Sequence, residues 1–293
     1  MRKLAIAGLV LLLTLSITFV ALASTIHWTY EGEEGPAHWG ELSPDFAACS
    51  AGLQQSPIDI PAGAPVNPAD IVFNYSPSAL TVVNNGHTIQ ANYDAGSTIT
   101  IDGMDYQLLQ FHFHGDSEHT VAGQHSPMEA HFVHGNAAGQ LAVVGVMLKE
   151  GDANVALEPV FANMPAEKGD PVAVAGATVS AGDVLPVDRS YYRYDGSLTT
   201  PPCTEGVKWF VMANAVTISA GQQAAYTALH ADNYRPVQAM NARSFYLGGA
   251  PEGLPVTGGL MVVGVLWMTV ASGLVVLSIV WVVRRRREGV NVS

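Results

Sequence analysis

The runs Gln110-Phe111-His112-Phe113-His114 and Glu129-Ala130-His131-Phe132-Val133-His134 decide how this chain folds. Side chains on a β-strand point alternately to opposite faces, so His112 and His114 present two imidazoles on the same side. A third histidine on a neighbouring strand would complete a set of three nitrogen ligands. Three protein ligands with an open fourth position are typical of a catalytic Zn²⁺ site rather than of a closed structural one. The sequence therefore predicts a zinc site on one face of a β-sheet.

Two polar residues accompany these histidines. Gln110 shares a strand face with His112, and Glu129 shares one with His131. Each is expected to accept a hydrogen bond from the ring N–H that does not face the metal, which fixes the tautomer of its histidine. The alternative interpretation treats the histidines as ordinary core residues. That interpretation does not explain why two hydrogen-bond acceptors accompany them.

The composition indicates a β-rich globular body. The chain has 293 residues, enough for one large domain or two small ones. Its 29 Gly, 17 Pro and only 13% charged residues are typical of a β-rich fold. The formal net charge is −12, but six basic residues and one acidic residue lie in the terminal segments. The body alone carries 7 basic and 24 acidic residues, a net charge near −17. So acidic a surface repels phosphate groups, and we expect no nucleic-acid partner.

Hydrophobic segments frame the body. Residues 1–23 have the basic start, apolar run and Ala21-Leu22-Ala23 site of a cleaved signal peptide; an uncleaved anchor is the alternative. Residues 259–283 are apolar and long enough to span a bilayer, and residues 284–293 begin with four arginines that should stay cytoplasmic. We therefore expect an extracytoplasmic body, anchored at the cell surface by its C-terminal segment.

The linker 249–258 contains Leu254-Pro255-Val256-Thr257-Gly258, which resembles the sortase sorting signal of cell-wall-anchored proteins. If this signal operates, cleavage falls between Thr257 and Gly258 and the apolar segment is removed. The alternative is a plain Pro/Gly linker before a permanent transmembrane helix. The sequence leaves both open, so the expected partner of the tail is either the cell wall or the membrane.

The two cysteines, Cys49 and Cys203, fit an oxidising compartment. They are the only pair available, and export favours one disulfide that closes a long loop. The alternative is two free thiols.

Residues 24–248 are expected to form a single, mostly β domain with a few short helices. Alternating or apolar runs predict strands, of which 128–134 and 141–148 should form an antiparallel pair, and Asn85-Gly86 is a turn signal. The expected strands are 71–75, 80–84, 88–93, 97–101, 106–114, 128–134, 141–148, 191–194 and 207–216. Short helices are expected at 153–163 and at 220–229, where Ser219 is the cap. Residues 165–186 are interpreted as an irregular Gly/Ala-rich excursion.

The order of several motifs between residues 27 and about 245 resembles that of the alpha-class carbonic anhydrases. The matching runs include Trp28-Thr29-Tyr30, Gln55-Ser56-Pro57-Ile58-Asp59-Ile60, Asn84-Asn85-Gly86-His87, Gln110 to His114, Ser117-Glu118-His119-Thr120-Val121, Glu129 to His134, Gly196-Ser197-Leu198-Thr199-Thr200-Pro201-Pro202 and Asn233-Tyr234-Arg235-Pro236. The resemblance implies a twisted, mainly antiparallel central sheet with a conical pocket and zinc at its base. The short loop after His114 and the cysteine pair resemble the bacterial branch, whose members are often dimers, so a homodimer is an expectation.

The resemblance also implies roles for individual residues. His112, His114 and His131 would hold Zn²⁺, with the backbone carbonyl near Asn233 as the partner of His114. Water activated by zinc would attack CO2, and the Thr199 hydroxyl would accept a hydrogen bond from that oxygen and donate its own to Glu118. His119 and His134 are interpreted as structural.

The remaining pocket residues divide by polarity. Because CO2 is apolar, it needs an apolar wall beside the zinc, and Val133, Val143, Leu198 and Trp209 match the wall of the family. Thr200 should line the polar side. His87 matches the proton shuttle at the pocket mouth, with Asn85 and Tyr30 along the proton path.

These observations predict a surface carbonic anhydrase that interconverts CO2 and bicarbonate. A non-catalytic carbonic-anhydrase-like surface binding module is the main alternative, although such relatives typically lose a zinc histidine. A zinc hydrolase that uses the same activated water is a third possibility.

Overall fold

The computed structural model describes residues 26–67 and 70–245. The predicted signal peptide at 1–23, the sorting-like linker at 249–258, the hydrophobic segment at 259–283 and the basic tail at 284–293 lie outside these residues. Within the described ranges, no helix has both the length and the apolar character needed to cross a membrane.

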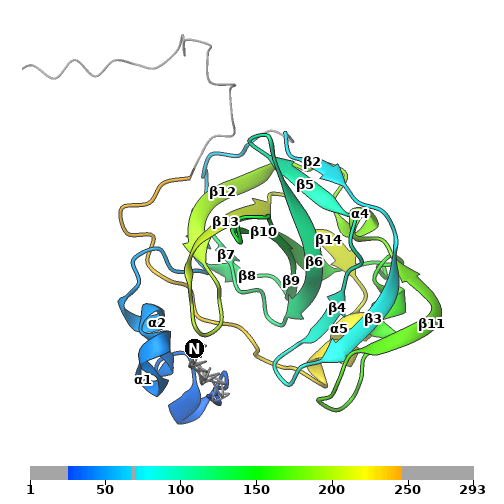
Figure 1. Ribbon diagram of the computed structural model, residues 1–293, viewed down its shortest axis with the longest axis horizontal. Coiled ribbons are helices and arrows are strands. Elements are labelled where there is room, and N and C mark those ends of the chain that lie inside the picture. The colour runs from blue at the N-terminus through cyan, green and yellow to red at the C-terminus, as the bar shows by residue number, and fades with distance from the viewer. Residues whose placement is uncertain (1–25, 68–69, 246–293) are drawn as a thin grey trace, which may run out of the picture. The chain divides into compact units, whose positions relative to one another are not determined.

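The domain is built on one eleven-stranded, mostly antiparallel sheet (Figure 1). The strands of its main path lie in the order β11-β3-β4-β6-β9-β10-β13-β12, and β2, β5 and β14 pair beside it. Among the described residues of this sheet, the parallel pairs are β10 with β13 and β10 with β14. The bounds are β2 (Val72–Asn74), β3 (Ser78–Asn84), β4 (Ile89–Asn92), β5 (Thr98–Ile101), β6 (Met104–His114), β9 (Met128–Gly135), β10 (Leu141–Glu150), β11 (Val172–Val179), β12 (Tyr191–Ser197), β13 (Glu205–Met212) and β14 (Val216–Ile218). The expectation of a mostly β single domain is confirmed.

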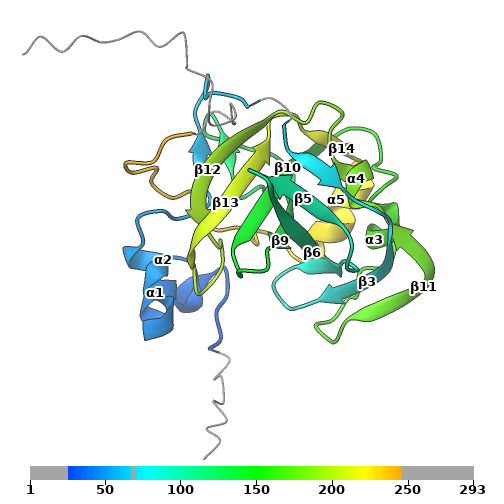
Figure 2. The same cartoon turned by 45° about the horizontal axis from the view of Figure 1, so that its top comes forward.

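Smaller elements surround the sheet. A second sheet joins β1 (Asp59–Ile60), β7 (Thr120–Val121) and β8 (Gln124–His125). The helices are η1 (Gly32–Glu34), α1 (Trp39–Leu42), η2 (Pro44–Phe46), α2 (Ala48–Ala51), α3 (Glu158–Phe161), α4 (Ala181–Val184) and α5 (Ala220–Thr227). Both views show α1 and α2 close together (Figure 2). Ser219 begins α5 with a reciprocal capping box with Gln222, as its position before the helix predicts.

The two faces of β6 and β9 differ in character. Phe111, Phe113 and Phe132 have no exposed surface and lie in the larger hydrophobic core. The rings of Phe111 and Phe132 stack with centroids 5.1 Å apart. Strand alternation then directs His112, His114 and His131 to the opposite face, so packing of the aromatic core fixes the strands that carry the histidines.

The predicted strands at 128–134 and 141–148 are confirmed as the antiparallel pair β9–β10. Three of the expected segments differ from the structure. The excursion at 165–186 contains the strand β11 and the helix α4 (Figure 2). The strand was missed because β11 is an edge strand with few polar residues, so it shows no alternation of polar and apolar positions. Its pairing with β3 supplies the order instead. The helix expected at 153–163 covers only Glu158–Phe161, since Pro159 fits only the first turn. The strand expected at 207–216 stops at Met212, and β14 begins separately at Val216.

The predicted disulfide between Cys49 and Cys203 is present and bridges 154 residues of sequence. Cys49 belongs to α2, and Cys203 follows the loop after β12. Both sulfur atoms are buried in a small apolar cluster with Trp39. The N-terminal segment is thereby fastened to the loop that carries Thr199 and Thr200.

Candidate metal centre

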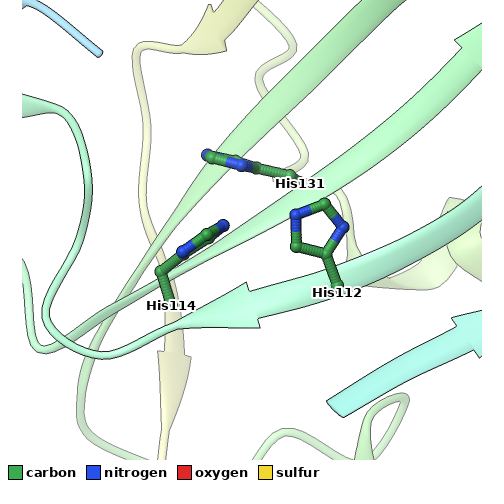
Figure 3. Close-up of side chains that lie close together, drawn as sticks. All are labelled: His112, His114 and His131. Atoms are coloured by element: carbon green, nitrogen blue, oxygen red, sulfur yellow. The ribbon is translucent and has the colours of Figure 1, made fainter. Parts of the chain in front are cut away.

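His112, His114 and His131 converge on one point above the sheet (Figure 3). His112 and His114 come from β6, and His131 lies directly opposite His112 on β9. One ring nitrogen from each lies within 4.8 Å of the others. His114 and His131 are only 1% exposed. Three imidazoles so close together and so deeply buried form a set of ligands that can hold a metal ion.

In each histidine of β6, the Nδ1 atom points away from the convergence point and lies beside a hydrogen-bond acceptor. Nδ1 of His112 lies 2.9 Å from Oε1 of Gln110. Nδ1 of His114 lies 2.7 Å from the backbone carbonyl of Asn233. Because both acceptors take an N–H, each ring presents an unprotonated Nε2 to the centre. Nε2 of His114 is buried and has no hydrogen-bond partner among the described residues.

His131 has the reverse orientation. Its Nε2 lies 2.9 Å from Oε1 of Glu129, so Nδ1 is the atom that faces the centre. Glu129 is fully buried and also accepts from the backbone N–H and Nδ1 of His119, both at 2.9 Å. Nε2 of His119 lies 2.7 Å from the hydroxyl of Tyr194. His119 therefore holds the carboxylate that holds His131.

The electrostatics of the centre favour neutral histidines on β6. Burial lowers the pKa of His112 well below its ordinary value, and the neighbouring histidines lower it further. Burial also lowers the pKa of His114. Burial lowers the pKa of His131 as well, but the Glu129 carboxylate outweighs it, so the net pKa is raised. Burial raises the pKa of Glu129, but His119 and His131 outweigh burial and hold it well below the usual range. Neutral imidazole is the form that binds a metal, so the β6 pair is ready to do so.

Glu118 lies beside the three histidines with no exposed surface. Its Oε1 accepts the backbone N–H of Arg235 at 2.9 Å. Its Oε2 lies 3.6 Å from Nε2 of His114 and 3.8 Å from Nδ1 of His131, and it has no hydrogen-bond partner in the described part of the chain. One carboxylate oxygen is therefore fixed, and the other faces the centre.

Thr199 lies on the loop after β12 and is only 6% exposed. The hydrogen bond from its hydroxyl to Glu118, which the resemblance implies, is absent among the described residues. The free oxygen of Glu118 instead faces Nε2 of His114 and Nδ1 of His131, at 3.6 and 3.8 Å. Thr199 still lines the same cavity as His112 and His131.

The centre opens into a pocket with two sides. An apolar side of about 140 Å³ includes all of the predicted wall and both threonines: Val133, Val143, Leu198, Thr199, Thr200 and Trp209. Val143 and Trp209 are opposite one another on β10 and β13, which explains how residues distant in sequence form one wall. A polar side of about 160 Å³ includes Tyr30, Asn85, His87 and Thr200.

Sequence reasoning missed three residues of the polar side: Trp28, Thr88 and Gln90. Gln90 lies opposite His112 on the neighbouring strand β4. Residues directly opposite one another in an antiparallel pair share a face, so the pairing of 88–93 with 106–114 would have placed Gln90 there. Nothing in the sequence pattern near Trp28 indicates that its ring reaches the pocket.

His87 lies at the polar side of the pocket, stacked on Trp28 with ring centroids 3.7 Å apart and planes within 8°. Burial and, to a smaller extent, the nearby charge of Lys168 lower the pKa of His87 to about 4. The side-chain oxygen of Asn85 accepts the backbone N–H groups of His87 and Thr88, at 2.9 and 3.0 Å. Asn85 therefore shapes the turn that presents His87.

Comparison with known proteins finds relatives of this chain in one family. The model of the eukaryotic-type carbonic anhydrase family matches residues 34–247. A carbonic anhydrase of Klebsiella pneumoniae is 44% identical over 239 residues, which cover 80% of this chain and 96% of the relative. One from Neisseria gonorrhoeae is 41% identical over 240 residues, covering 81% and 94%. The solved alpha-carbonic anhydrase of Thermovibrio ammonificans, in complex with the inhibitor sulfanilamide, is similar with a TM-score of 0.72 and 45% identity, covering 75% of this chain and 98% of that one.

Proposed function

The chain belongs to the eukaryotic-type carbonic anhydrase family, and from that premise we propose that it hydrates CO2 reversibly to bicarbonate and a proton, with Zn²⁺ held by His112, His114 and His131. One observation carries the proposal. Three buried imidazoles each direct one nitrogen at a common point while the other nitrogen lies against an acceptor. A purely structural cluster would have no reason to leave Nε2 of His114 without a partner.

The residues present fit zinc. Three neutral nitrogen donors leave a fourth position open, as in catalytic zinc sites. The acceptors Gln110, Asn233 and Glu129 fix the ring orientations before any metal binds, which lowers the cost of binding. When bound, the zinc supplies a water acidified enough to act as a nucleophile at neutral pH, chemistry for which carbonic anhydrases are themselves the standard example.

Glu118 and Thr199 orient the reacting oxygen. The free Oε2 of Glu118 can accept the hydroxyl proton of Thr199, which leaves the Thr199 oxygen only as an acceptor toward the nucleophile. A nucleophile that donates to Thr199 points its lone pair at the apolar side of the pocket. The contribution is positional, because the carboxylate and the hydroxyl neither gain nor lose charge.

The apolar side of the pocket suits CO2. Val133, Val143 and Leu198 offer no hydrogen bond to displace, so a small apolar molecule can replace weakly held water there. Thr200 lies on both sides of the pocket and can hydrogen-bond the polar product. Substrate and product thus have different neighbours within a few ångströms.

His87 transfers the proton to buffer. Stacked on Trp28, with a pKa of about 4, its imidazole holds almost no proton at neutral pH, so transfer requires the ring to leave the stack. His87→Ala should slow turnover more than it slows the interconversion of CO2 and bicarbonate measured by isotope exchange, and imidazole buffer should rescue turnover. Equal loss in both assays without rescue would contradict this role.

We propose an extracytoplasmic location. The disulfide supports it, since such bonds persist mainly in oxidising compartments. The signal peptide, the membrane or cell-wall anchor and the homodimer remain predictions. Mass spectrometry of the native C-terminus separates the two anchors: peptides from residues 260–283 in the mature protein exclude sortase processing. Light scattering of the purified protein measures its oligomeric state.

Stopped-flow CO2 hydration tests the proposed function. The wild-type chain, with its zinc content quantified, should hydrate CO2 rapidly and be inhibited by a sulfonamide, and His112→Ala should abolish both properties. A protein with one bound zinc and no hydration activity would favour the non-catalytic binding module. Hydrolysis of activated esters that exceeds CO2 hydration would favour a zinc hydrolase.

A further inference from the structure

Arg235 is a buried cation that no step above uses. Its side chain is 1% exposed and makes three short hydrogen bonds through the guanidinium group. Nη1 donates to Oε1 of Gln55 and to the carbonyl of Ser56, each at 2.8 Å, and Nη2 donates to the carbonyl of Cys49 at 2.7 Å. All three acceptors belong to one segment, residues 49–56, and all are neutral.

Burial of this charge is expensive without a nearby anion. Burial lowers the pKa of Arg235 to about 10, and the carboxylate of Glu118 opposes that change. The guanidinium carbon lies 5.8 Å from the ring centroid of Trp39, which adds a weak cation–π contact. Nε of Arg235 has no hydrogen-bond partner among the described residues. The guanidinium supplies the donors for three buried oxygens, and its charge lies near the buried carboxylate of Glu118, so the side chain links residues 49–56 to the metal centre.

The main chain of the same residue touches the metal centre. The backbone N–H of Arg235 donates to Oε1 of Glu118 at 2.9 Å. This bond decides which carboxylate oxygen stays free, because it occupies Oε1 and leaves Oε2 facing His114 and His131. The guanidinium anchors therefore fix the position of a backbone donor, and that donor fixes Glu118.

The segment that anchors the guanidinium also holds the loop of Thr199. Cys49 is bonded to Cys203, whose backbone N–H donates to the carbonyl of Thr200 at 2.8 Å. Ser56 and Ser197 exchange two hydrogen bonds, at 2.9 and 3.1 Å, immediately before Leu198 and Thr199. Residues 49–56 are thus bonded to both ends of the loop at 197–203.

We propose that Arg235 is a positioning residue: its guanidinium holds it on residues 49–56, the segment to which the loop of Thr199 is bonded, and its backbone N–H thereby sets Glu118 in register with that loop. The inference rests on the proposed function, since it assigns Arg235 to the same reaction. It predicts that the side chain of Arg235 affects turnover only through Glu118. A misplacement of about 1 Å at such a group can cost about 100-fold in rate.

A double-mutant cycle tests this prediction. Arg235→Met keeps most of the volume and removes the donors, and it should lower kcat/KM for CO2 hydration between about 10- and 100-fold. In a Glu118→Gln background the same substitution should cost less than about threefold, because the group it positions has already been changed. Arg235→Lys should recover part of the rate, since it restores one charged donor.

Zinc affinity provides a second measurement. The guanidinium hydrogen bonds go to Gln55, Ser56 and Cys49 and not to a ligand histidine or its acceptor within the described ranges, so the zinc Kd of Arg235→Met, measured by chelator competition, should stay within about threefold of the wild type. If Arg235→Met does not fold, Gln55→Met takes its place. That substitution removes one acceptor of the guanidinium and should cost about three- to tenfold in kcat/KM, again only when Glu118 is intact.

Arg193→Met is the matched control. Arg193 is a largely buried arginine that donates to the carboxylate of Asp102 at 2.6 Å, and it lies on the opposite side of β12 from Tyr194. It should leave kcat/KM within about twofold in both backgrounds. Losses from Arg235→Met that add fully to those of Glu118→Gln, or a parallel loss of zinc affinity, would overturn the inference. A wild-type chain inert toward CO2 would instead overturn the proposed function, and this inference with it.

Discussion

The two faces of β6 and β9 arise from the same strand alternation but have different functions. On one face Phe111, Phe113 and Phe132 are fully buried among apolar neighbours. On the other face His114 and His131 are almost as deeply buried, yet one nitrogen of His114 has no hydrogen-bond partner among the described residues. The aromatic face stabilises the sheet, and the histidine face holds buried polar atoms that a metal ion can satisfy. Because the two functions lie on separate faces, the buried polar atoms of the metal site can lower the stability of the protein without disturbing the aromatic packing that holds the strands together.

The largest expected difference between the faces concerns adjacent residues of β6. His114→Ala should remove a ligand and lower CO2 hydration by about 10³-fold or more, since the activated water depends on the metal. Phe113→Ala should reduce the free energy of unfolding by about 3–5 kcal/mol, because it leaves a cavity in the core. Stopped-flow kinetics and urea denaturation of both variants measure the two effects. A folded Phe113→Ala protein that loses as much kcat/KM as His114→Ala would break the comparison.

The next largest effect concerns the acceptors behind the histidines. Glu129→Gln removes the negative charge beside His131 while keeping a similar shape, and it should weaken zinc binding about 10- to 100-fold. Chelator competition measures the Kd. Gln107→Leu, a change on β6 away from the pocket, is the control and should leave the Kd unchanged. Equal zinc affinity in Glu129→Gln and the wild type would show that the carboxylate does not tune the ligand.

A histidine on the aromatic face should affect the stability of the protein rather than its zinc binding. His134 is fully buried on β9, and its Nε2 lies 2.6 Å from the hydroxyl of Tyr75. Burial lowers the pKa of His134 to about 3. Between pH 6.5 and 3 the unfolded chain binds a proton that the folded chain does not, so this residue lowers the stability as the pH falls through that window.

The stability advantage of the wild type over His134→Gln should therefore shrink as the pH falls from 7 to 4.5. Urea denaturation of the zinc-free proteins at both pH values measures it, because removal of zinc excludes metal loss as a cause. A gap in unfolding free energy that stays constant with pH would contradict a neutral, structural His134.

The smallest expected effect lies at the pocket mouth. Trp28→Ala should expose His87 and raise its pKa from about 4 toward 6.5, because burial is the main cause of the lowered value. NMR titration of the imidazole protons measures the pKa. His27→Ala should raise it less, since the charge of His27 is a minor cause. An unchanged pKa in Trp28→Ala would show that the stacked ring does not lower the pKa of His87.

The sequence allowed prediction of the parts that follow strand periodicity. The His-x-His run predicts two imidazoles on one face, and the alternation in 128–134 brings His131 beside them. Residues placed by tertiary contacts escaped prediction. Gln90 depends on the pairing of β4 with β6, Trp28 on the path of an irregular segment, and Arg235 on three carbonyl and amide oxygens nearly two hundred residues earlier in sequence. The strand β11 escaped because small, exposed residues show no alternation and its order comes from β3.

Calorimetric titration of the metal-stripped chain with Zn²⁺ tests most directly whether the histidine face is completed by a metal ion. We predict one zinc per chain, a raised melting temperature on binding and recovery of CO2 hydration in proportion to the zinc added. His112→Ala should lose all three. Zinc that binds equally well to His112→Ala, or that binds the wild type without restoring hydration, would contradict the account.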